Sequence, residues 1–147
     1  MATFRRATAV WRGTGQEGTG TLNTTNKFFN NTPYSFKTRF ENEDGVQGTN
    51  PEELIAAAHA GCFAMALSFA IAQAGFVPEE LKVEAKVTLD AVAGGFGITG
   101  IALTLAGRVP GMSEAQFTEL ANGAKAGCPI SQALSAVPIS LDATFAA

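Results

Sequence analysis

The sequence has little charge and few of the side chains that build metal sites. Lys, Arg, Asp and Glu make up 16% of its 147 residues, against about 25% in an ordinary globular domain. Its 10 basic and 13 acidic residues leave a formal net charge of −3, which supplies no positive field for nucleic acid or anionic lipid. With one histidine, two cysteines and no CxxC pair, a closed zinc site would lack ligands. We therefore expect no nucleic-acid partner, no bound metal and no cofactor.

Hydrophobic residues are abundant, at 46% of the chain. This content excludes disorder, and the length predicts a single domain, residues 1–147, with a substantial core. So much apolar surface is hard to bury in one small subunit, so we expect an obligate oligomer. Two cysteines do not form the dense disulfide framework of a small secreted domain. Arg5, Arg6 and Arg12 leave no room for the apolar segment of a signal peptide, which predicts a cytoplasmic location.

The N-terminal third has the pattern of β structure. Residues 4–12 resemble a strand, and a loop rich in Gly and Thr follows at 13–21. Across residues 34–40 aromatic and polar side chains alternate, which predicts a strand with Arg39 on the face opposite the phenylalanines. Residues 43–45 are typical of a turn.

A strong helix start precedes a long apolar run. Asn50 can cap the helix, Pro51 suits its first position, and Glu53 completes a sequence resembling a capping box. The run 54–72 has the length of a membrane span. However, it contains many alanines and His59, and it lacks basic or aromatic anchors. We therefore predict a central helix buried on all sides, and no membrane partner.

The C-terminal half alternates strands and helices. The alternation at 81–90 is typical of a half-exposed strand, and its Gly-rich connection to the next strand predicts an antiparallel hairpin. The full set of expected elements is strands 81–90 and 98–109, a helix capped by Ser113 that runs to about Ala126, a short helix from Pro129, and strand 139–145. The fold class is α+β, with mainly antiparallel sheets around a long central helix.

The two cysteines occupy unlike positions. Cys62 lies mid-helix beside the small residues Ala60 and Gly61, and His59 lies three residues earlier on the same face, where it could stabilise a thiolate. Cys128 lies at a helix start, where backbone N–H groups lower a thiol pKa. A buried cysteine and a lone histidine are also ordinary core residues. The pair nonetheless suits an attacking and a resolving thiol, the combination that peroxide chemistry requires.

Three segments carry a family resemblance. Thr49–Leu54, Ala57–Phe63 and Cys128–Ser131 together resemble the OsmC/Ohr family over nearly the whole chain. The variant His59–Phe63 is more similar to the osmotically inducible (OsmC) branch than to the organic hydroperoxide resistance (Ohr) branch. The resemblance implies an OsmC-like intertwined homodimer that reduces organic hydroperoxides with thiols.

The resemblance also implies roles for both cysteines. Cys62 would be the peroxidatic thiol and Cys128 the resolving one, with an external dithiol or lipoylated protein as reductant. Apolar side chains favour apolar peroxides; those expected near the site are Phe36, Phe40, Phe63 and Met65. Two alternatives are a dimeric binding or structural protein with packed cysteines, and a Cys–His hydrolase using Cys62 and His59. The hydrolase lacks an evident orienting residue or oxyanion loop.

An arginine and a glutamate assist the thiol in the family that this sequence resembles. Glu52 matches the glutamate and Arg39 the arginine, with Arg12 and Arg108 not excluded by pattern alone. Arginine can hold a thiolate and orient a peroxide oxygen, while a carboxylate fixes the guanidinium. Glu52 and Cys62 lie about 15 Å apart along one straight helix. We therefore expect Glu52 to act in the partner subunit's site.

Overall fold

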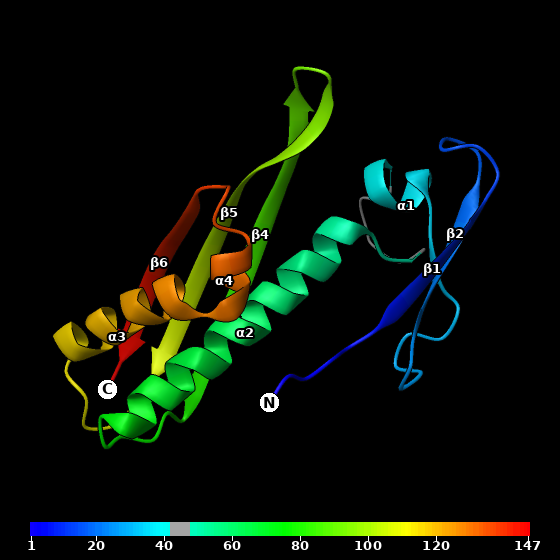
Figure 1. The fold of residues 1–147 in the computed structure, drawn as a ribbon. Helices are drawn as coiled ribbons and strands as arrows, with labels where there is room; N and C mark the ends of the chain where they lie inside the picture. The colour runs from blue at the N-terminus through cyan, green and yellow to red at the C-terminus, as the bar shows by residue number, and fades with distance from the viewer. Residues whose placement is uncertain (42–47) are drawn as a thin grey trace. The chain divides into compact units, whose positions relative to one another are not determined.

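The computed structural model describes residues 1–41 and 48–147 (Figure 1), so the turn predicted at 43–45 lies outside the described residues. The described residues form two compact units, Met1–Leu54 and Ile55–Ala147. Helix α2 (Pro51–Gln73) begins in the first unit and continues into the second.

A three-stranded antiparallel sheet forms most of the first unit. Its strands are β1 (Ala7–Arg12), β2 (Thr19–Thr24) and β3 (Thr32–Tyr34), in the order β1-β2-β3. The predicted first strand is confirmed, although it starts at Ala7 and not at residue 4. Strand β2 begins inside the segment predicted as a Gly- and Thr-rich loop, so that prediction is wrong for residues 19–21.

A glycine explains why β2 does not look like a strand. Gly20 pairs with Trp11 on one side and with Tyr34 on the other. A Cβ at Gly20 would lie 2.4 Å from the Tyr34 ring and 2.6 Å from the Trp11 ring. The missing side chain lets the two aromatic rings approach, with centroids 5.4 Å apart. A glycine inside a strand often marks such a close approach.

The second predicted strand, at 34–40, is wrong. Residues Phe36–Phe40 form a short helix, α1. Ser35 accepts a hydrogen bond from the Thr38 N–H at 3.1 Å, and the Thr38 hydroxyl accepts one from the Ser35 N–H at 2.7 Å. This reciprocal cap satisfies the free donors of the first turn and outweighs the β propensity of the aromatic residues. Arg39 therefore lies beside Phe40, its guanidinium carbon 5.4 Å from the ring centroid, and not on the opposite face.

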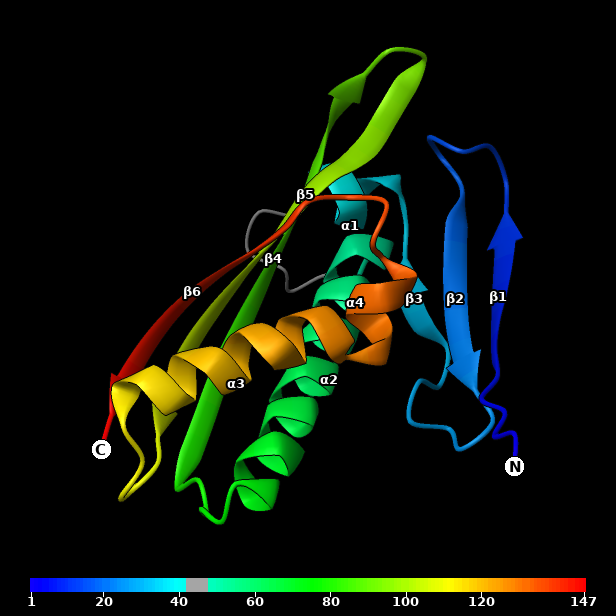
Figure 2. The same cartoon turned by 60° about the vertical axis from the view of Figure 1, so that its left-hand side comes forward.

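The second unit packs helices against a second three-stranded sheet. Its elements after α2 are β4 (Glu80–Val92), β5 (Gly95–Arg108), α3 (Glu114–Gly127), α4 (Pro129–Ala133) and β6 (Ile139–Ala146). Strands β4 and β5 form the predicted antiparallel hairpin, and β6 pairs with β5 in parallel. Figure 2 shows α2, α3 and α4 on one side of this sheet. The predicted α+β class, with mainly antiparallel pairing, is confirmed among the described residues.

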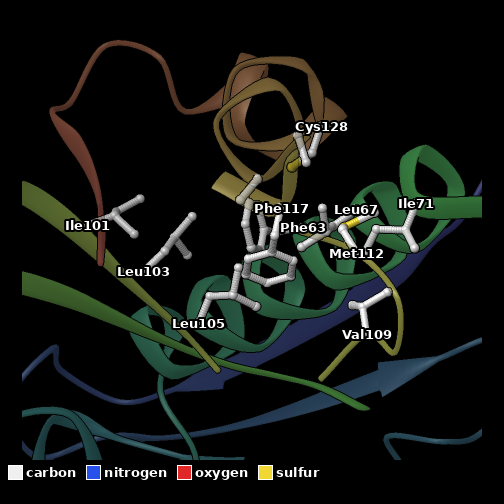
Figure 3. Packing of buried hydrophobic residues seen from close by; sticks show 12 residues of the cluster. Phe63, Leu67, Ile71, Ile101, Leu103, Leu105, Val109, Met112, Phe117 and Cys128 are labelled. Carbon is white, nitrogen blue, oxygen red and sulfur yellow. The ribbon is translucent and has the colours of Figure 1, made fainter. Parts of the chain in front are cut away.

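The core of the second unit lies between α2, α3 and the inner face of the sheet (Figure 3). Its α2 side chains are Phe63, Leu67 and Ile71, all fully buried and spaced four residues apart. The predicted burial of α2 on all sides holds for this face only. On the other side of the helix Met65 and Phe69 are each 64% exposed in the single chain.

Helix α2 is long and apolar enough to cross a membrane by length and composition alone. Its buried row nevertheless packs directly against the sheet and α3. We therefore describe α2 as the core helix of this fold.

Candidate active site

An arginine–glutamate pair occupies the first unit. Arg39 Nε lies 3.2 and 3.1 Å from the two Glu52 carboxylate oxygens, and Nη2 lies 2.5 Å from Oε1. The Glu52 side chain is largely buried, with 11% exposed, whereas the Arg39 side chain is 38% exposed. Asn50 strengthens the arrangement because it caps α2 through the Glu53 N–H at 2.8 Å and donates to the Thr38 carbonyl of α1 at 3.3 Å. Asn50 thus links α1, which carries Arg39, to the start of α2, which carries Glu52.

Aromatic residues surround this arginine. A cavity of about 220 Å³ lies within the first unit, and Arg39 is one of its lining residues. Its walls are Trp11, Gly15, Tyr34, Ser35, Phe36, Arg39, Phe40 and Pro51. The Phe36 and Phe40 rings, one helical turn apart on α1, have centroids 4.7 Å apart. The cavity therefore combines one fixed positive charge with an apolar wall.

Two reduced cysteines lie side by side in the second unit. Cys62 comes from the middle of α2 and is partly exposed, whereas Cys128 caps α4 and is fully buried. Their side chains are close enough to hydrogen-bond to each other, and the Ile130 N–H contacts both thiols. Pro129 has no N–H, so the first N–H groups of α4, those of Ile130 and Ser131, are the ones available to sulfur.

The two thiols differ in acidity. Burial raises the pKa of the Cys62 thiol above its ordinary value, the Ile130 N–H opposes this rise, and the neighbouring Cys128 adds to it. Burial also raises the pKa of Cys128, but hydrogen bonds from Ser131, Cys62 and Ile130 outweigh it, so its pKa falls below the ordinary value. Within the isolated pair Cys128 is therefore the more acidic thiol and Cys62 the more accessible one.

His59 reaches the other cysteine through a serine. Its Nε2 lies 2.7 Å from the Ser131 hydroxyl, which lies 3.2 Å from the Cys128 sulfur. His59 and Cys128 are fully buried and Ser131 is 4% exposed. Burial lowers the pKa of His59, so the imidazole is neutral near pH 7. The predicted support of a thiolate by His59 would therefore act on Cys128, through Ser131.

Sequence reasoning identified Cys62, Cys128 and His59, which the structure gathers in the second unit, and Arg39 and Glu52, which it pairs in the first. It missed the Trp11 and Tyr34 walls of the aromatic cavity, because Gly20 concealed strand β2. It also missed Ser131, although the position three residues after a helix-capping cysteine is where a backbone N–H meets the cap. Phe63, expected to line an apolar wall, is instead fully buried in the core. Within 1–41 and 48–147, no three His, Cys, Asp or Glu residues group as metal ligands.

Comparison with known proteins identifies the family. The family model described as OsmC-like protein matches residues 42–142. The chain is 48% identical to Peroxiredoxin OsmC of Escherichia coli, over 97% of this chain and 96% of the relative. It is 40% identical to the Organic hydroperoxide resistance protein of Xanthomonas axonopodis pv. citri, over 60% of this chain and 61% of the relative.

Solved structures agree with the sequence matches. The structure of the Organic Hydroperoxide Resistance Protein OhrB of Bacillus subtilis superposes with a TM-score of 0.70 at 26% identity, covering 95% of this chain and 98% of that one. The chain therefore belongs to the OsmC/Ohr family, as its sequence motifs predicted.

Proposed function

We propose that this protein is a cysteine-based peroxidase that reduces organic hydroperoxides to alcohols. The observation that carries the proposal is the pair of reduced thiols, one partly exposed and one buried, in contact at the start of α4. The printed names of the relatives, a peroxiredoxin and an organic hydroperoxide resistance protein, support the same chemistry. The location we propose is the cytoplasm, where thiols are kept reduced.

The reaction has two chemical steps before the enzyme is recycled. The Cys62 thiolate attacks the terminal peroxide oxygen, the O–O bond breaks, and the alkoxide takes up a proton and leaves as the alcohol. Cys62 is then a sulfenic acid. The Cys128 thiolate attacks the Cys62 sulfur, an S–S bond forms, the S–O bond breaks, and hydroxide leaves as water after taking up a proton. An external dithiol or a lipoylated protein then reduces the disulfide.

We assign the attack on peroxide to Cys62, because a hydroperoxide cannot reach the fully buried Cys128 sulfur. Acidity alone would favour Cys128. The peroxidatic role therefore requires a positive charge that favours the Cys62 thiolate, and Arg39, held by Glu52, is the residue we assign to this task. The aromatic cavity beside Arg39 favours an organic substituent on the peroxide.

We further propose that the active protein is a homodimer joined through the exposed face of α2. Apolar side chains at three- and four-residue spacing form that face, which in the single chain is open to water; its exposed residues are Ala58, Gly61, Met65, Phe69 and Ala72. A second copy would cover this surface. Glu52 and Arg39 form one intra-chain pair, so in a composite site they would act together on the Cys62 of the partner chain.

The peroxidase proposal is tested by counting thiols. Reduced protein receives one equivalent of cumene hydroperoxide, and free thiols are titrated under denaturing conditions. We expect rapid loss of two thiols per chain, and no disulfide in the Cys62→Ser chain. No loss of thiols at stoichiometric peroxide would instead favour a binding or structural protein. A Cys–His hydrolase is disfavoured because the Nε2 of His59 is directed to Ser131.

The composite site is tested by subunit complementation. We expect homodimers of the Cys62→Ser chain to be inactive and homodimers of the Arg39→Gln chain to be much slower than the normal dimer. A mixed dimer regains one complete site of its two, or about half the activity of a normal dimer, only if the cysteines and the arginine come from different chains. No recovery after verified subunit exchange would place Arg39 in the site of its own chain.

A further inference from the structure

The described residues of the second unit contain a buried hydrogen-bonded row that connects a histidine and a serine, to which the two-cysteine reaction above assigns no role, with Cys128. It runs from His59 Nε2 to the Ser131 hydroxyl at 2.7 Å, and from that hydroxyl to the Cys128 sulfur at 3.2 Å. The Ser131 N–H donates to the same sulfur at 3.3 Å. His59 and Ser131 come from α2 and α4, 72 residues apart in the chain. The row therefore joins two elements at the cysteine that we assign to the resolving step.

We propose that Ser131 and His59 are positioning residues for this resolving step: together they hold the Cys128 sulfur as a thiolate aimed at oxidised Cys62. The inference rests on the proposed peroxidase function. Neither residue is assigned a contact with the hydroperoxide. Their effect should fall on formation of the Cys62–Cys128 disulfide and not on the attack of Cys62 on peroxide.

The hydrogen count of the row supports this role. Ser131 has one hydroxyl proton, which can go either to the imidazole or to sulfur. When Nε2 donates to Ser131, the hydroxyl is free to donate to Cys128, so the thiolate accepts two hydrogen bonds from one residue. When Nε2 accepts from Ser131, the hydroxyl oxygen can accept from the Cys128 thiol. The two tautomers of a neutral histidine thus match the two protonation states of the cysteine.

Burial of the histidine is costly if its only purpose is packing. Among the described residues, His59 Nδ1 is the buried side-chain nitrogen or oxygen with no hydrogen-bond partner. Leaving such an atom unsatisfied is unfavourable, and an apolar side chain of similar size would avoid the cost. The hydrogen bond between Nε2 and Ser131 is the interaction that such an apolar side chain could not make.

The other charged and titratable groups near Cys128 are few. From α2 the groups are Cys62, which hydrogen-bonds to it, and His59. On α3 the nearest charged residue in sequence is Lys125, whose Nζ is directed to the Ile139 carbonyl at 3.3 Å. The sheet residues packed in this core, from β4, β5 and β6, are apolar. Ser131 is therefore the main polar partner through which the thiolate can be tuned.

The direct test measures the Cys128 thiolate without any peroxide. In the Cys62→Ser chain Cys128 is the one remaining cysteine, so thiolate absorbance at 240 nm against pH reports this group alone. A chain lacking both cysteines gives the background. We expect Ser131→Ala to move the midpoint to higher pH, His59→Phe to move it less in the same direction, and Ser131→Thr, which keeps the hydroxyl, to restore it. Ser135→Ala, at an exposed serine of the same segment, should leave the midpoint unchanged.

A kinetic test in the two-cysteine chain follows the two steps separately. We expect Ser131→Ala to slow disulfide formation at pH 7 by about tenfold, the lower end of the effect of losing one hydrogen bond to a charged group, while Cys62 oxidation is not slowed. Equal slowing of both steps, or an unmoved 240 nm midpoint in folded Ser131→Ala protein, would overturn the positioning role. If the midpoint moves but no variant consumes peroxide, the proposed function fails while the tuning of Cys128 stands.

Discussion

Glu52→Gln isolates what the carboxylate contributes to Arg39. Glutamine keeps one acceptor oxygen and nearly the same shape, but it removes the negatively charged carboxylate that accepts hydrogen bonds from Nε and Nη2 of Arg39. A hydrogen bond to a charged group contributes about 1.5–3 kcal/mol. Because the Arg39 side chain is 38% exposed, solvent screening reduces this to about 1–2 kcal/mol. The oriented guanidinium should then be populated about 5–30 times less, and the rate of Cys62 oxidation should fall by that factor.

Rapid mixing with cumene hydroperoxide in a single turnover measures this rate. Glu53→Gln is the matched control, because it removes the same charge from the same first turn of α2 but faces Thr49 and not Arg39. A double-mutant cycle with Arg39→Gln should show that the two losses are not additive. The reasoning is refuted if Glu53→Gln slows the reaction as much as Glu52→Gln, since the effect would then come from the helix dipole.

Further predictions concern the thiols, the histidine and α2. In the Cys128→Ser chain Cys62 should stop at the sulfenic acid and then over-oxidise, which mass spectrometry with a sulfenate trap detects. Because Cys128 also raises the pKa of Cys62, the rate of attack on peroxide in this chain should depend less on raising the pH. The folded-state pKa of His59 is lowered, so stability should fall as pH drops below the unfolded value of about 6.5. In His59→Gln this part of the loss should disappear from urea unfolding curves between pH 7 and 5. Phe63→Ala should lower the free energy of unfolding by about 3–5 kcal/mol, whereas Phe69→Lys should retain the fold but sediment as a monomer.

The sequence predicted the fold best where pattern and local chemistry agree. The hairpin of β4 and β5 and the Ser113 cap of α3 follow from strict alternation and from a capping box. Prediction failed where the two conflict. Residues 36–40 alternate like a strand, but the Ser35–Thr38 cap, a contact of two side chains with two backbone groups, makes them a helix. Alternation over so few residues fits either state, and here the local cap decides between them.

The candidate site divides in the same way. Motif positions identified the two cysteines and the arginine–glutamate pair, because their chemistry is specific to their residue types. Trp11 and Ser131 were missed because their importance comes from neighbours distant in sequence. Trp11 reaches Tyr34 across Gly20, and Ser131 meets a histidine 72 residues away. A single sequence does not show such pairings in advance of the fold.

One thiol is the more acidic and the other the more accessible, and this difference bears on how the reaction is controlled. Since Cys128 is the more acidic thiol but is fully buried, the second unit alone would hold its negative charge where peroxide does not reach. Cys62 would then react slowly unless a nearby guanidinium stabilises the Cys62 thiolate. If that guanidinium comes from Arg39 of another chain, dissociation of the dimer should leave both thiols reduced and slow. Dilution below the dimer dissociation constant should therefore reduce the rate of Cys62 oxidation per chain, and the Arg39→Gln dimer should lose that concentration dependence.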